Sequence, residues 1–150
     1  MTKFEVFKFL HVTAAIIWVG GAILGAFFTE RAKKAEPAHR LGIVRDMEFV
    51  SRRMFAPAAM AALLFGVLMV LEADVIDFDQ TWIILGSGGI VVSTILGLGY
   101  LGPQAKKLAA ELAAGDAAAG GRLTAISRVA QLDLFVLLVV VWAMVAKPGL

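Results

Sequence analysis

The fold is set by residues 4–28, FEVFKFLHVTAAIIWVGGAILGAFF, an apolar run long enough to cross a lipid bilayer as one helix. About 20 residues suffice, because the hydrocarbon is roughly 30 Å thick and an α-helix rises about 1.5 Å per residue. The apolar core of a cleaved signal peptide is only about 7–15 residues long and follows its positive charge. Here the dense positive charge comes after the run. We therefore expect this segment to be a retained membrane helix.

Three further apolar runs follow at about 55–72, 81–101 and 130–146. Of all residues, 60% are apolar and 17% are charged, whereas a soluble domain is nearer half apolar and a quarter charged. A bilayer admits only helices or closed barrels, and these runs are too apolar for barrel strands. The sequence therefore predicts an all-α integral membrane protein in one domain, residues 1–150, built as an antiparallel four-helix bundle.

The connection between the first two spans has a pattern of its own. After Pro37, apolar residues recur at helical spacing, at Ile43, Met47, Val50 and Met54. A stripe of this kind beside charged residues is typical of an amphipathic helix at the membrane surface. We expect such an interfacial helix to run directly into the second span.

Charge predicts the orientation and excludes several functions. Residues 29–53 hold seven lysines and arginines and residues 102–129 hold four, whereas residues 73–80 hold none. The positive-inside rule then places both long connections in the cytoplasm and both termini outside. The chain has no cysteine, which excludes disulfides and thiolate metal sites. The net charge of only +2 gives no support for a nucleic-acid partner.

A histidine lies inside the first span. His11 is about 10 Å below the outer edge of the run that begins at Phe4, level with residues 65–69, 88–89 and 139–142 of the other spans. An ionisable side chain at this depth is a candidate functional group. The low side-chain volume at Gly88 and Gly89 leaves the gap that a flat macrocycle needs, and its iron needs an axial imidazole.

These features predict heme b or another porphyrin, with His11 as the metal ligand. Gly88 and Gly89 would form the pocket wall and Trp18 would pack beside the ring. The second axial ligand is open between Met69, Met144, a small exogenous ligand and His11 of another subunit, since His39 cannot reach this depth.

Two other functions stay open. His11 can simply hydrogen-bond a neighbouring helix, while Gly21, Gly25 and Gly89 let another helix approach closely. The protein would then be a non-enzymatic accessory or scaffold subunit that self-associates or joins a larger membrane complex. A third interpretation is a small transporter that uses Asp133 and Glu72, although Asp133 lies only about one turn inside its span, within reach of water or Arg128.

Three stretches carry a resemblance to known families: residues 8–12 (KFLHV), 18–21 (WVGG) and 144–148 (MVAKP). In order and spacing the chain resembles a group of small bacterial four-helix membrane proteins. The group comprises a family of predicted integral membrane proteins of unknown function, the HemJ-type protoporphyrinogen oxidases, and the membrane domain of copper-resistance protein D. The resemblance implies the bacterial inner membrane.

In the HemJ-type enzymes the first-helix histidine ligates heme, and His11 matches it. The resemblance thus implies a heme-dependent oxidoreductase for electron transfer or porphyrin oxidation. Other HemJ-type residues have no counterpart: the essential third-helix lysine falls at 86–87, a further histidine near Leu98, and an acidic residue near Gln131. The closing Lys147 and Pro148 favour the family of unknown function.

Overall fold

The computed structural model describes residues 1–73 and 76–149, and within them it contains helices and no strand. The elements are α1 (Lys3–Lys34), α2 (Pro37–Val50), η1 (Ser51–Phe55), α3 (Ala56–Glu72), α4 (Thr81–Thr94), η2 (Ile95–Leu101), α5 (Gly102–Ala114) and α6 (Ala119–Ala146), where η1 and η2 are π-helical.

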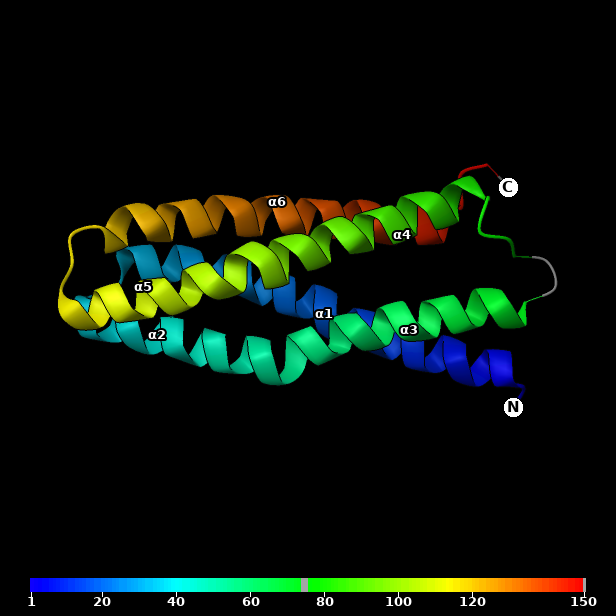
Figure 1. Ribbon diagram of the computed structural model, residues 1–150, viewed down its shortest axis with the longest axis horizontal. Helices are drawn as coiled ribbons and strands as arrows, with labels where there is room; N and C mark the ends of the chain where they lie inside the picture. Colours follow the sequence, from blue (N-terminus) through cyan, green and yellow to red (C-terminus); the bar gives the residue numbers. More distant parts are fainter. Residues whose placement is uncertain (74–75, 150) are drawn as a thin grey trace.

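The elements join into four long helices that run antiparallel (Figure 1). α2, η1 and α3 form one helix, and α4, η2 and α5 form another. All four are long and apolar enough to cross a membrane, so the predicted all-helical fold with four spans is confirmed. They contain 28 to 36 residues, or about 42–54 Å of helix at 1.5 Å per residue, which is more than the hydrocarbon requires.

The two π-helical segments each precede a proline. η1 ends at Phe55, two residues before Pro57, and η2 ends at Leu101, two residues before Pro103. Proline has no N–H to donate and its ring collides with the carbonyl four residues earlier. The wider π turn accommodates both effects without ending the helix.

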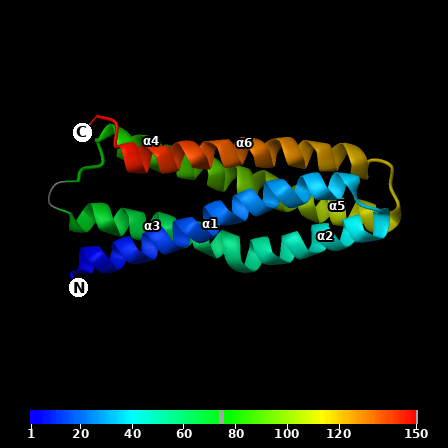
Figure 2. The ribbon, with the colours of Figure 1, turned by 180° about the vertical axis from the view of Figure 1, so that it is seen from behind.

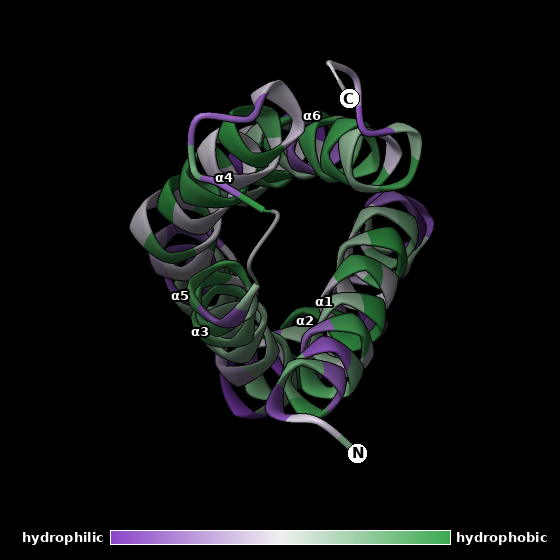
Figure 3. Ribbon diagram, turned by 90° about the vertical axis from the view of Figure 1, so that its right-hand side faces the viewer, coloured by the Kyte–Doolittle hydropathy of each residue, from purple (hydrophilic) through white to green (hydrophobic). Residues whose placement is uncertain are grey.

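The four long helices surround one axis, but two of them pack on each other only in part. α1 packs between α3 and α6, and α4 packs on α6. The second and third long helices pack on each other through α2 and α5, whereas α3 and α4 barely touch. Figure 2 shows α1 crossing the back of the bundle, and Figure 3 shows the four long helices standing around the bundle axis. We call the end with both chain termini the terminal end, and the opposite end, formed by residues 29–53 and 102–128, the basic end.

The helix predicted before the second span is present, and it lies along the bundle. Figure 1 shows α2 continuing the line of α3 with a bend at η1. Its buried residues Ile43 and Val44 form a hydrophobic cluster with Ala32 of α1, Leu108 of α5 and Leu123 of α6. Of the predicted apolar stripe, Ile43 is thus buried by neighbouring helices and Met47 and Val50 are half-buried, whereas Met54 is exposed.

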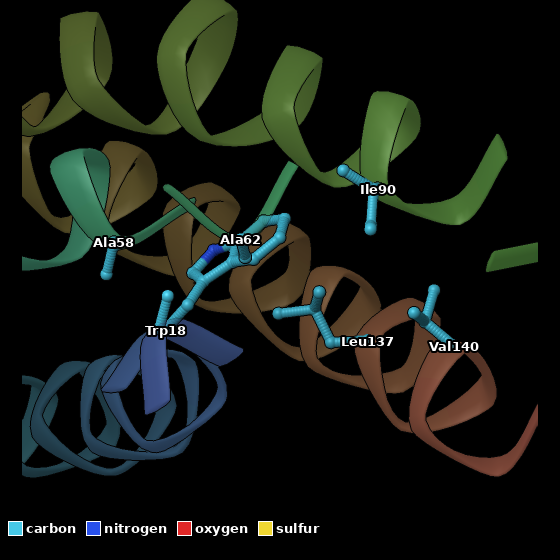
Figure 4. Packing of buried hydrophobic residues seen from close by; sticks show 7 residues of the cluster. Trp18, Ala58, Ala62, Ile90, Leu137 and Val140 are labelled. Carbon is cyan, nitrogen blue, oxygen red and sulfur yellow. The ribbon is translucent and has the colours of Figure 1, made fainter. Parts of the chain in front are cut away.

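A second hydrophobic cluster lies nearer the middle of the bundle. Trp18 of α1 reaches between the small residues Ala58 and Ala62 of α3 and Leu137 of α6, as Figure 4 shows. Alanines on α3 make room for the indole ring, so α1 and α3 approach closely on this side. Trp18 of this cluster also lines the cavity described in the next subsection.

Candidate functional site

His11 binds the backbone of α3. Its Nδ1 lies 2.7 Å from the carbonyl oxygen of Ala62. A carbonyl only accepts, so Nδ1 is the donor and the neutral ring keeps its lone pair on Nε2. A Cβ at Gly66 would lie 3.1 Å from two atoms of the ring, so the missing side chain of Gly66 makes room for the imidazole. The predicted depth of His11, level with residues 65–69, agrees with this contact.

The gap predicted beside His11 on the third span is filled by α6. A Cβ at Gly89 would overlap the side chain of Val140, and one at Gly86 would overlap the end of Met144. Gly88 is exposed, and a Cβ there would meet no atom within 4 Å. On α4 the space beside Gly89 is therefore occupied by α6, whereas the space beside Gly88 is open.

Two of the other predicted cofactor residues, Trp18 and Met144, belong to one hydrophobic cluster. Trp18 is buried in the central cluster, and Met144 packs at the edge of that cluster while covering Gly86. Met69 is half-buried on α3. Among the described residues, no group of three or more histidine, cysteine, aspartate or glutamate side chains is placed to hold a metal ion.

The residues of the predicted self-association surface pack within the chain. The ring of Phe55 covers Gly21, Met47 faces Gly25, and Val140 covers Gly89. These glycines therefore take part in packing within the bundle, and Gly25 and Gly89 are partly exposed.

A cavity of about 530 Å³ lies between the four long helices. On α1 its lining runs from Trp18 to Thr29, which is about 16 Å of helix at 1.5 Å per residue. Towards the terminal end it is lined by apolar and small residues, namely Trp18, Gly21, Ala22, Phe55 and Ala59. Towards the basic end the lining is more polar and includes Thr29, Glu48, Ser51, Arg52, Thr94, Lys106 and Asp133.

The cavity opens sideways between the two π-helical segments. Its exposed lining residues come from η1, η2 and the start of α5, among them Ser51, Arg52, Leu98 and Lys106. This opening exists because α3 and α4 do not pack against each other, and because both long helices bend at their π turns. Two basic side chains, Arg52 and Lys106, thus border the entrance.

Two buried polar side chains lie in the cavity wall. Ser93 of α4 is 1% exposed and Asp133 of α6 is 6% exposed. They are neighbours, yet Ser93 Oγ and Asp133 Oδ1 make no hydrogen bond of ordinary geometry with any described residue. Buried polar atoms in native proteins almost always have a partner, so two such atoms in one cavity mark a place where a ligand can bind.

Asp133 was predicted from sequence as a candidate, whereas most of the cavity was not. The alternative partner Arg128 forms no ion pair with it among the described residues. Glu72, the other carboxylate predicted for a transporter, lies at the terminal end, 4.0 Å from Lys3. Arg52 and Lys106 were missed as site residues. The only sequence signal for them was a proline a few residues away in each helix.

Comparison with known proteins places the whole chain in one family. No curated protein and no solved structure matched the chain. Residues 5–148 match the family described as "Predicted integral membrane protein (DUF2269)". The match covers nearly the full length and includes all four long helices. The chain therefore belongs to this family of predicted integral membrane proteins.

Proposed function

We propose that this protein binds a small amphipathic molecule in the central cavity, and that the molecule enters from the bilayer between η1 and η2. The observation that carries the proposal is the cavity itself, about 530 Å³ with an apolar end, a polar end and a sideways opening. Pockets for small molecules are commonly of this size, mostly apolar, with a few converging polar groups.

The depth of the cavity suits such a ligand. The apolar run begins at Phe4, so Gly25 in the lining lies about 31 Å along α1, close to the inner boundary of the hydrocarbon. A molecule bound here keeps its apolar part beside Trp18 and its polar part level with Arg52 and Asp133. Both parts then have the surroundings they have in a lipid leaflet, which favours exchange with the membrane.

The proposal includes an orientation. The basic end carries eleven of the fourteen lysines and arginines, so the positive-inside rule places it in the cytoplasm. The cavity then opens at the cytoplasmic face of the inner membrane. This is the leaflet from which the ligand would be taken.

Filling the cavity tests the proposal. Gly97 lines the cavity, and a Cβ there meets no atom within 4 Å, so Gly97→Leu takes up cavity space. Gly88→Leu is the matched control, because Gly88 is equally open, lies on the same long helix and is not in the lining. Binding is followed by the fluorescence of Trp18 in protein whose Trp82 and Trp142 are replaced by Phe, reconstituted in nanodiscs.

The probes are decylamine, decanol and decanoate, which share a chain length and differ in the charge of the head. We expect saturable binding of at least one probe, weakened about tenfold or more by Gly97→Leu and unchanged by Gly88→Leu. If none of the three probes binds saturably, or if both leucine variants behave alike, the cavity is not a ligand site.

Heme binding through His11 is the second candidate. Its one support is the bond between His11 Nδ1 and the carbonyl of Ala62, which leaves Nε2 as the free nitrogen. Metal-ligating histidines usually have their other nitrogen held in this way. Because Gly86 and Gly89 of α4 are covered by Met144 and Val140, we derive no redox step from this site.

A further inference from the structure

We propose that the ligand of the cavity is a lipophilic cation, a molecule whose ammonium group binds Asp133 and Ser93 while its apolar part lies against Trp18. This inference rests on the proposed function, since it names the chemical class of the molecule bound in the same cavity.

The first argument is the missing partner of Asp133. The residue is 6% exposed, and among the described residues it forms no ion pair. Ser93 is a hydroxyl donor beside it, but a buried carboxylate without a counter-ion is still strongly unfavourable. An ammonium group supplies the counter-ion and further N–H donors, so a cationic ligand lowers this cost.

The second argument is the chemistry of the two free atoms. Asp133 Oδ1 accepts hydrogen bonds, and Ser93 Oγ both accepts and donates. A primary or secondary ammonium has at least two N–H groups and can donate to both oxygens. A carboxylate or phosphate head has no proton to donate and would place a second negative charge beside Asp133.

The remaining charges of the lining lie outside the buried wall. Arg52 and Lys106 are exposed at the entrance, whereas Asp133 is in the buried wall. Glu48, the other lining carboxylate, is half-buried on α2. Both lining acids favour a cation inside the cavity, and Asp133 is the more buried of the two.

The experiment compares the three probes in wild type, Asp133→Asn and Asp46→Asn. Asn keeps the shape of Asp and removes its charge, and Asp46 is exposed on α2 and does not line the cavity. We expect decylamine to bind most tightly in wild type. We expect Asp133→Asn to weaken decylamine about tenfold or more and to leave decanol unchanged. We expect Asp46→Asn to change the binding of neither probe by as much as threefold.

Two results would overturn the cation while leaving the cavity a ligand site. One is equal binding of decylamine by wild type and Asp133→Asn. The other is a preference for decanoate that is lost in Arg52→Gln or Lys106→Gln, which would identify an anionic ligand held at the entrance. Absence of saturable binding by all three probes would instead remove the proposed function, and this inference with it.

Discussion

The imidazole of His11 and the backbone carbonyl of Ala62 are joined by a 2.7 Å hydrogen bond between α1 and α3. The ring lies where Gly66 has no side chain, so α3 provides both the acceptor and the space. This hydrogen bond is enough to give His11 a structural role, and it also leaves Nε2 as the nitrogen that a metal would bind. Absorption spectra distinguish the structural role from metal ligation.

The first prediction concerns heme. If His11 ligates heme, wild type expressed with added heme shows a Soret band and a reduced-minus-oxidised signal, and both are lost in His11→Ala. A Soret band of equal size in the two proteins would place any heme elsewhere. If neither protein shows a band, His11 has only its packing role.

The second prediction concerns Gly21. A methyl group there would overlap the ring of Phe55, whereas one at the adjacent Gly20 would meet nothing within 4 Å. Overpacking of this kind costs about 1–3 kcal/mol, because η1 must move away from α1. We expect Gly21→Ala to lower the thermal transition in detergent, measured by circular dichroism, and Gly20→Ala to leave it unchanged. Equal transitions would show that Phe55 moves aside freely.

The third prediction concerns Arg40. Its guanidinium donates from Nε to the carbonyl of Ala32 at 2.9 Å and from Nη2 to that of Ala35 at 2.9 Å. These carbonyls lie at the end of α1, where a helix leaves acceptors without partners. We expect Arg40→Ala to reduce the free energy of unfolding by about 1 kcal/mol. Arg45 is exposed on α2, the helix that also carries Arg40. Arg45→Ala is therefore the control and should leave the free energy of unfolding unchanged.

The fourth prediction concerns orientation. Because the chain has no cysteine, single cysteines report on one position each. Ala117 is exposed in the connection between α5 and α6 at the basic end, and Asp79 is exposed at the terminal end. In intact spheroplasts a membrane-impermeant maleimide should label Asp79→Cys and spare Ala117→Cys. The reverse pattern would place the basic end, and the cavity entrance with it, outside.

The four spans followed from the lengths of the apolar runs, because the thickness of hydrocarbon fixes the length of a crossing helix. The depth of His11 followed in the same way, from the rise per residue. The partner of His11 did not follow, since depth does not determine how a helix is rotated about its axis. His11 faces Ala62 and Gly66, although Gly88 and Gly89 were predicted to lie at a similar level.

The cavity could not be predicted from any one segment of the sequence, because it depends on how several helices pack against one another. Glycines leave space only where neighbours do not fill it, and Val140 and Met144 fill the space at Gly89 and Gly86. The open space lies instead where α3 and α4 do not pack and where two π turns face the same cavity. Pro57 and Pro103 lie beside the two bends, but the opening between them depends on the arrangement of all four long helices.

The position of α1 between α3 and α6 has a consequence for synthesis. Of these three helices α1 leaves the ribosome first and α6 leaves it last, yet α1 packs against both α3 and α6. Until α6 is inserted, Glu30 of α1 has neither Ser127 nor Gln131 as its partner. We therefore expect a hairpin of α1 and α3 to form in the bilayer first, and the cavity wall to be complete only once α6 has been translated.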